Sequence, residues 1–204
     1  MKRHRLSRHH LLPIVLCGLV FLGIPRVGQA QISNQDQAPF HSVSLYGMYS
    51  HPVSSRGISE WNQRLAVQAG LQIPFYTGRI EAGVHGQQWQ TLNAALPDWN
   101  ALFVFAGWQA VGAVNARTNL SGGVRIGNYV MMFDTDAVVG QRRESEFSVA
   151  PVVGLRVRLW NRMELHAEAM WVRVLTRPVI DSRQVSAGLS TTLDMPRWLE
   201  ALLK

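Results

Sequence analysis

The side chains with the clearest potential for chemistry alternate along one short segment, where Glu164, His166 and Glu168 are spaced two residues apart. In an extended strand this spacing places all three on one face. A histidine held between carboxylates can act as a general base. We expect Arg156 and Arg158 to lie beside them on the neighbouring strand. No serine shares the spacing of the three residues, so a buried network of paired charges is favoured over a catalytic site.

A second pair of such side chains, Glu81 and His85, also lies on one face of a strand-like segment. The pair can join the same charge network, but two ligands without a third do not make a metal site. The one cysteine, Cys17, lies in an apolar run near the N-terminus. The sequence has no phosphate-binding glycine loop, nucleophile elbow or zinc-protease helix. It therefore predicts no metal, no cofactor and no catalytic residue.

Residues 1–30 have the three parts of a secretory signal peptide. A basic head precedes the apolar run Leu11–Ile24, and small residues precede a cleavage position after Ala30. The run is shorter than the roughly 18–20 residues that a membrane-spanning helix needs. We expect residues 1–30 to be removed and 31–40 to form a periplasmic leader. Removal takes five basic residues with it, so the formal charge falls from +7 to about +2, which argues against nucleic-acid binding.

Alternation of apolar and polar residues dominates the rest of the chain and predicts β-strands. From Leu65 to Phe75 the odd positions are apolar, whereas the even positions are mostly polar or small. Phe103 and Phe105 break the rule, because they occupy the expected polar face of their strand. Eight strands are expected, at 41–51, 60–76, 78–90, 101–116, 119–134, 144–160, 163–176 and 183–194. Helical spacing returns only in residues 195–204, which we expect to form a short C-terminal amphipathic helix on the membrane surface.

The expected connections alternate between tight turns and longer loops, and both ends of the strand region fall on the side of the tight turns. An even strand number with this asymmetry is typical of a bacterial outer-membrane barrel. Closure pairs every strand edge, as the interior of a lipid bilayer requires. The sequence therefore predicts an all-β fold, an antiparallel up-and-down transmembrane β-barrel of about eight strands over residues 41–194.

The direction of the apolar face decides between a membrane barrel and a soluble periplasmic ligand-binding barrel. Strands of about ten residues suit a tilted crossing of the bilayer, and a polar face that mixes charges with glycines suits a narrow lumen. The lumen charge network is expected to consist of Arg64, Glu81, His85, Arg125, Arg156, Arg158, Glu164, His166 and Glu168. Aromatic residues at the two membrane interfaces are expected to be Tyr49, Trp61, Tyr76, Trp89, Trp99, Trp160, Trp171 and Trp198.

The signal peptide, strand number, alternation and turn asymmetry resemble those of the small eight-stranded outer-membrane proteins of the OmpA/OmpX type, over residues 40–194. The resemblance implies a location in the cell outer membrane of a Gram-negative bacterium. It also implies contact with outer-membrane lipid and lipopolysaccharide, and insertion by the outer-membrane assembly machinery. Such barrels usually end on a strand with a terminal aromatic residue. This chain continues through 195–204 and so departs from that assembly signal.

A non-enzymatic structural or surface-interaction protein is the favoured function, with a lumen filled by the charge network. Three alternatives stay open: a narrow porin-like channel for small solutes, a membrane lipid-modifying hydrolase that would use His166, and a soluble ligand-binding barrel. In a long loop, Arg142 and Arg143 are candidates for contact with lipopolysaccharide phosphates. Neither a ligand nor the oligomeric state follows from the sequence.

Overall fold

The computed structural model describes residues 40, 42–135, 142–177, 179–196 and 201. Its elements are the strands β1 (Ser42–Arg56), β2 (Trp61–Phe75), β3 (Gly78–Thr91), β4 (Trp99–Ala113), β5 (Thr118–Phe133), β6 (Arg143–Arg158), β7 (Met163–Val174) and β8 (Ile180–Asp194). Within the described ranges no helix is long and apolar enough to cross a membrane. The expected signal peptide, most of the expected leader and Trp198 lie outside the described residues.

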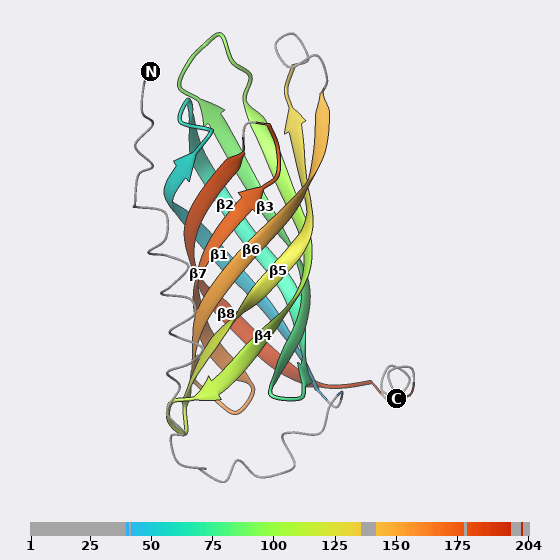
Figure 1. Cartoon of the computed structure of the whole chain (residues 1–204). Helices are drawn as coiled ribbons and strands as arrows, with labels where there is room; N and C mark the ends of the chain where they lie inside the picture. The colour runs from blue at the N-terminus through green and yellow to red at the C-terminus, as the bar shows by residue number, and fades with distance from the viewer. Residues whose placement is uncertain (1–39, 41, 136–141, 178, 197–200, 202–204) are drawn as a thin grey trace, which may run out of the picture. The chain divides into compact units, whose positions relative to one another are not determined.

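The strands form one closed barrel, in which each strand pairs antiparallel with the next and β8 pairs with β1 (Figure 1). The predicted all-β fold and the up-and-down antiparallel barrel are confirmed. Closure gives every strand a neighbour on both sides, so the backbone amides and carbonyls find partners within the sheet.

The two ends of the barrel differ in their connections. At the lower end in Figure 1, β2 passes to β3 through Tyr76 and Thr77, and β1 begins and β8 ends at the same end. At the upper end, β3 passes to β4 over 92–98 and β5 passes to β6 over 134–142. We call these the short-turn end and the long-loop end. The expected alternation of short and long connections holds at 92–98 and 134–142, but the long loop expected at 51–59 is wrong, because β1 passes to β2 over 57–60 only.

The outer wall of the barrel is apolar and its inner face carries the charges. Leu71, Val153 and Leu155 point outward and are 39%, 52% and 42% exposed. Arg156 and Glu168 point inward and are 1% and 5% exposed. A soluble barrel would bury the first group and expose the second, so the soluble ligand-binding alternative is wrong and the wall is suited to lipid.

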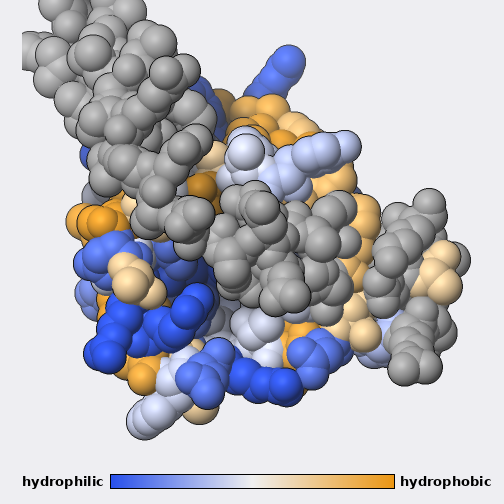
Figure 2. Space-filling model, turned by 90° about the horizontal axis from the view of Figure 1, so that it is seen from below, coloured by the Kyte–Doolittle hydropathy of each residue, from blue (hydrophilic) through white to orange (hydrophobic). Residues whose placement is uncertain are grey.

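Viewed from the short-turn end, hydrophilic residues gather on the visible face, and hydrophobic residues appear around its margin (Figure 2). This distribution matches a barrel whose rim meets water while its wall meets hydrocarbon.

Strand β1 is longer than the sequence pattern predicts, because it continues beyond residue 51 to Arg56. Its pairing is unequal on its two sides. It pairs with β8 along its whole length, with an irregularity between Pro52 and Ser54, but with β2 only from Ser44 to Tyr49. A proline is tolerated at this irregular segment because one edge of the strand there has no ladder partner. The β1–β2 seam is therefore short, and it is paired only in the half nearer the short-turn end.

Inward-facing glycines, among them Gly127 and Gly188, mark places where neighbouring strands lie very close. A Cβ atom on Gly188 would lie 2.0 Å from the carbonyl oxygen of Gly47, and one on Gly127 would lie 2.0 Å from that of Val104. Only glycine fits at such an approach. These positions allow the wall of a narrow barrel to curve strongly.

Candidate functional site

The lumen is divided along the barrel axis into two layers. The layer nearer the long-loop end is apolar and contains Ile58, Trp89, Trp99, Ala101, Phe103, Phe105, Tyr129, Met131, Ala150, Val152, Met170, Val172, Val174 and Ile180. The layer nearer the short-turn end is polar, and its buried members include Ser44, Gln68, Gln72, Glu81, Gln109, Ser121, Arg125, Arg156, Glu164, His166, Glu168 and Ser190. The polar layer uses inward positions from all eight strands, whereas the apolar layer comes mainly from β3 to β7, and beside it the inward residues Ser50 of β1 and Ser182, Gln184 and Ser186 of β8 are polar.

Arg125 lies at the centre of the polar layer, where it bridges two carboxylates from opposite sides. Its Nε donates to Glu81 Oε1 at 2.7 Å and its Nη2 to Glu81 Oε2 at 3.1 Å. Its Nη1 donates to Glu168 Oε1 at 2.6 Å and its Nη2 also to Glu168 Oε2 at 2.8 Å. All three side chains are fully buried. Such two-point contacts combine charge with fixed geometry, which is how a buried guanidinium is best satisfied.

Three glutamines complete the coordination of these carboxylates. Gln72 Nε2 donates to Glu81 Oε2 at 3.0 Å, and Gln109 Nε2 donates to Glu81 Oε1 at 2.9 Å. Gln68 Nε2 donates to Glu168 Oε1 at 3.1 Å. Sequence reasoning missed these amides because it followed the charged residues alone. Their inward, even-numbered positions in β2 were a usable signal for two of them.

A second group of charges lies closer to the short-turn end, around Glu164. Its Oε2 atom is 3.9 Å from Arg156 Nη1 and also 3.9 Å from Arg79 Nη1. Arg156 donates through Nη2 to Gln72 Oε1, which links this group to the central bridge. Arg79 was not expected in the network. The formal charges of the two groups cancel, because they pair three arginines with three glutamates, namely Arg79, Arg125, Arg156, Glu81, Glu164 and Glu168.

His166 lies between the two groups but lacks the partners of a catalytic base. Its Nε2 is 3.6 Å from Glu168 Oε2, and its ring meets Tyr46 edge-on with centroids 5.8 Å apart. Ser121, from β5, directs its hydroxyl to the carbonyl oxygen of Gly154 at 3.4 Å. Within the described residues neither ring nitrogen of His166 has a hydrogen-bond partner. The arrangement therefore lacks the nucleophile–histidine hydrogen bond of a hydrolase.

His85 belongs to the apolar layer and does not contact Glu81. Its Nδ1 is 3.2 Å from Gln87 Nε2, and the Oε1 of Gln87 accepts from Trp89 Nε1 at 3.1 Å and from Tyr129 Oη at 2.8 Å. Among the residues that the structure describes, no group of three His, Cys, Asp or Glu side chains could hold a metal ion. His85 is thus the polar end of a hydrogen-bonded chain among aromatic rings.

Two expected interface aromatics lie inside the barrel instead. Trp89 and Trp99 face each other across the β3–β4 ladder and stack with centroids 5.3 Å apart at 7°. They are 3% and 2% exposed, so their assignment to a membrane interface is wrong. Phe103 and Phe105 continue the same inward row, which explains why β4 breaks the alternation rule. The row is apolar because it belongs to the layer beside the long loops.

The remaining aromatic candidates divide by position. Tyr49 and Trp171 point outward from β1 and β7, whereas Tyr76 and Trp160 lie exposed in short turns. Trp61 packs against the apolar layer and donates from Nε1 to the carbonyl oxygen of Pro97 at 2.8 Å. The outward and turn residues hold positions that interface aromatics take.

Two expected members of the lumen network lie outside it. Arg64 is exposed, because the β2–β3 register shifts between Gln63 and Leu65 and leaves Arg64 as the extra residue of a bulge. Its assignment to the lumen is therefore wrong. Arg158 pairs in register with Glu164, but it is exposed at the rim of the short-turn end.

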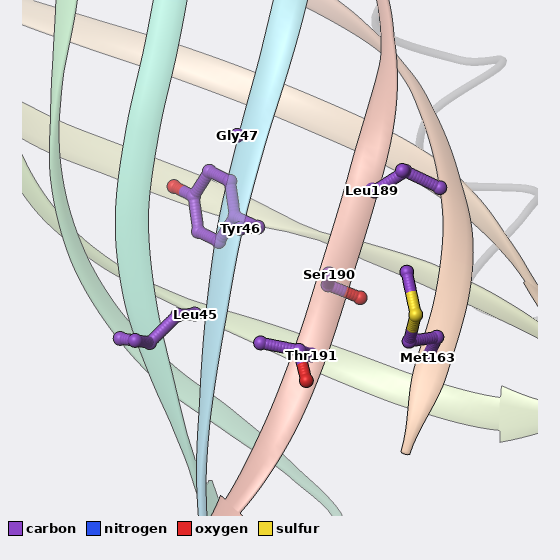
Figure 3. Close-up of a pocket in the computed structure, with 7 residues that line it drawn as sticks. All are labelled: Leu45, Tyr46, Gly47, Met163, Leu189, Ser190 and Thr191. Carbon is purple, nitrogen blue, oxygen red and sulfur yellow. The ribbon is translucent and has the colours of Figure 1, made fainter. Parts of the chain in front are cut away.

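The outer wall carries a shallow groove of about 290 Å³ where β7, β8 and β1 lie side by side (Figure 3). Leu45, Leu189 and Met163 border it, and Gly47 leaves it open because a Cβ there would meet nothing within 4 Å. A second hollow of about 150 Å³ lies at the long-loop end, among Trp61, Trp99 and other residues. Neither hollow includes Arg125 or another member of the central bridge.

No protein-family model and no curated protein matches the sequence. Solved structures match its fold. Neisserial surface protein A superposes with a TM-score of 0.54 at 12% identity, covering 74% of this chain and 95% of that one. The N-terminal β-barrel domain of Pseudomonas aeruginosa OprF superposes with a TM-score of 0.50 at 10% identity, covering 76% of this chain and 100% of that one.

The attachment invasion locus protein Ail of Yersinia pestis, solved in complex with the heparin analogue sucrose octasulfate, also matches. Its TM-score is 0.51 at 13% identity, over 74% of this chain and 97% of that one. The present chain thus has the fold of the small eight-stranded outer-membrane β-barrels. At these identities the likeness concerns architecture alone.

Proposed function

We propose that this protein is a non-enzymatic barrel of the cell outer membrane, with a closed lumen and with its activity on its long-loop end and outer wall. The observation that carries the proposal is the complete burial of Arg125, Glu81 and Phe103, which reach the lumen from three different strands. Side chains without solvent contact at mid-barrel leave no water-filled path at that level. An eight-stranded barrel has room for little more than its own side chains.

A porin-like channel is the second candidate, and two barriers in series argue against it. An ion that moved along the axis would have to displace the Arg125 bridge and then enter the aromatic layer around Trp99 and Phe103. Opening the bridge exposes or separates buried charges, which costs several kcal/mol. Dehydrating an ion in an apolar layer costs more again.

A lipid-modifying hydrolase is a weaker candidate. His166 is fully buried in the lumen, whereas a lipid substrate would approach from the outer wall. Ser121 is engaged with a backbone carbonyl rather than with His166. We therefore assign the polar layer a structural role, in which neutralised charges fill the lumen and fix the positions of the strands.

Single-channel recording tests the closed lumen. The purified barrel is reconstituted in a planar bilayer, and we expect no steady conductance from the wild type. The matched test is a variant that removes one central side chain from each barrier, Arg125→Ala with Phe103→Ala, which should conduct more than the wild type if its barrel still migrates as a folded form on an unheated gel. Stable wild-type currents that change when Arg156→Glu reverses one lumen charge would establish the channel instead.

The location is tested by fractionation. The signal-peptide pattern, the apolar wall and the short-turn and long-loop ends all fit insertion in the outer membrane with the short turns in the periplasm. We expect the protein in urea-washed outer membranes, in contact with lipid and lipopolysaccharide, and dependent on the outer-membrane assembly machinery. Recovery in the soluble periplasmic fraction would contradict this location.

A further inference from the structure

Three arginines from three adjacent strands form a cationic patch on the outer wall near the long-loop end. Arg173 of β7 and Arg56 of β1 both pair in register with Asp181 of β8. Arg183 of β8 pairs in register with Trp171 of β7. Directly paired residues point to the same face of a sheet, and Arg56, Arg173 and Arg183 are all exposed. We call Arg56, Arg173 and Arg183 the arginine sector.

The arginine sector lies at the upper border of the apolar wall. Below it, towards the short-turn end, the outward residues include Ala169 of β7 and Val185 of β8, which pair with each other. Trp171 lies between these apolar residues and Arg173. Along the wall, apolar residues are thus followed by an aromatic ring and then by arginines. This is the order of side chains expected from the hydrocarbon to the headgroups of a membrane. In the proposed orientation this border is that of the outer leaflet.

The guanidinium groups of the sector keep hydrogen-bonding capacity for a ligand. Arg173 Nε is 3.7 Å from Asp181 Oδ1, which is too long for a hydrogen bond, and its side chain is 49% exposed. Arg183 lies over the ring of Trp171 with its Cζ 5.9 Å from the centroid. Stacking on an aromatic ring leaves the edge of a guanidinium open for an anion. One carboxylate among three arginines gives the patch a positive charge.

The sector is the part of the outer wall where exposed arginines lie on three adjacent strands, while Arg64 on β2 and Arg143 on β6 are further exposed arginines near the long-loop end. On three other strands the first polar residue above the apolar run of the outer wall is neutral, namely Gln88 on β3, Asn100 on β4 and Ser145 on β6, whereas on β2 it is Arg64. A general need for polar side chains at the membrane border would be met by such amides and hydroxyls. The clustering of arginines on β7, β8 and β1 therefore needs a more specific reason.

We infer that the arginine sector binds the phosphate groups of an anionic glycolipid of the outer leaflet. Arginine is the residue that best matches phosphate, because its planar fork donates two parallel hydrogen bonds. Trp171 and the apolar wall below it would contact the sugar and the acyl chains of the same molecule. This inference rests on the proposed outer-membrane location but not on the closed lumen, so the lipid-binding and conductance experiments fail independently.

Native mass spectrometry of the full mature barrel, released from detergent micelles, tests the inference. The probes are lipid A with its phosphates and the same lipid A after dephosphorylation. The sector variant is Arg173→Gln with Arg183→Gln, and Arg183→Gln alone serves as a milder second variant. The matched control, Arg117→Gln with Arg162→Gln, removes two exposed arginines at the short-turn end. Folding of each variant is verified by its mobility on an unheated gel.

We expect the wild type and the control to prefer phosphorylated lipid A, and the sector variant to bind it roughly 30-fold more weakly, at about 1 kcal/mol for each arginine. Binding of dephosphorylated lipid A should be the same in all variants. Equal binding of both lipids by the wild type, or an equal loss in the control, would overturn the inference. Displacement of lipid A by millimolar inorganic phosphate would also overturn it, because the site would then recognise a free ion rather than a lipid.

Discussion

At the scale of single residues, Arg125 holds together two acids that would otherwise repel one another. Glu81 and Glu168 come from β3 and β7, on opposite sides of the lumen, and each shares two hydrogen bonds with the guanidinium. Phe105 covers the same guanidinium at 4.7 Å from its ring centroid. Arg125 therefore lies at the boundary between the polar and apolar layers and contacts both.

Replacement of Arg125 by methionine should destabilise the barrel by about 3–5 kcal/mol, because it leaves two buried carboxylates without their cation. Glu81→Gln should cost clearly less, since Arg125 then remains paired with Glu168. The measurement is equilibrium unfolding in urea, followed by the difference in gel mobility between folded and unfolded barrel. Arg117→Met, at an exposed turn, is the control and should have almost no effect. A cost for Arg125→Met no larger than that for Glu81→Gln would contradict the bridging role.

The residue scale also shows how far alternation could predict the site. The rule placed Glu81, Arg125, Glu164 and Glu168 on the inner face, where the structure has them buried. It also puts Gln68 and Gln72 on the inner face, but it does not show that their amides support the carboxylates, because an inward glutamine has the same pattern as a solvated one. Alternation with a period of two residues shows which face of the sheet a side chain occupies. It does not show how deep along the barrel axis that side chain lies.

At the scale of strands, curvature depends on where glycine occurs. Gly188 faces inward and approaches the backbone of β1, whereas Gly47 faces outward into the groove of Figure 3 with open space beside it. Gly188→Ala should destabilise the barrel by about 1–3 kcal/mol, because the added methyl group forces the strands apart. Gly47→Ala should be neutral or stabilising by about 0.5 kcal/mol. Urea titrations of both variants check this contrast, and equal effects would show that the close approach does not constrain β8.

The short β1–β2 pairing leads to a second prediction at the scale of strands, which concerns the rate of amide exchange in β1. Above Tyr49, β1 pairs with β8 but not with β2, whereas β5 and β6 pair over 118–132 and 143–157. Amides of Ser50–Arg56 that point away from β8 should exchange with deuterium much faster than amides of the β5–β6 ladder. Residue-resolved hydrogen exchange of the barrel in detergent measures this. Slow exchange along the whole of β1 would mean that the seam is closed in solution.

Irregularities within strands explain the errors of the sequence prediction at this scale. A bulge at Arg64 inserts one residue and turns that side chain away from the lumen. A comparable irregularity lets β1 continue past Pro52, where the alternation had suggested an end. Trp89 and Trp99 were misassigned because a position at the end of a strand suggests a membrane interface. In the alternation of their strands, however, both occupy inward positions and so lie in the lumen. Bulges and lumen layers depend on contacts between strands distant in sequence, so a single strand does not reveal them.

At the scale of the whole molecule, the outward apolar wall is the property that requires a bilayer. Val153 lies at the middle of the outward apolar row of β6, and Val53 lies on β1 beyond that belt, towards the long-loop end. Val153→Arg should therefore cost about 2–4 kcal/mol in folding into a bilayer, and Val53→Arg about 0–1 kcal/mol. Reversible folding into phospholipid vesicles across a urea series provides the two values. Similar costs at both positions would contradict the assigned depth of the wall.

The change of lumen chemistry along the axis also restricts how the strands can slide during assembly. A shift of one strand by two residues keeps its apolar side toward lipid, so the outer wall offers little resistance to that error. Inside, the same shift would move a carboxylate such as Glu81 towards the tryptophans, or an aromatic ring towards Arg125, and both exchanges bury an uncompensated charge. The order of side chains within the lumen thus selects one stagger of the eight strands, and with it the tilt and diameter of the finished cylinder.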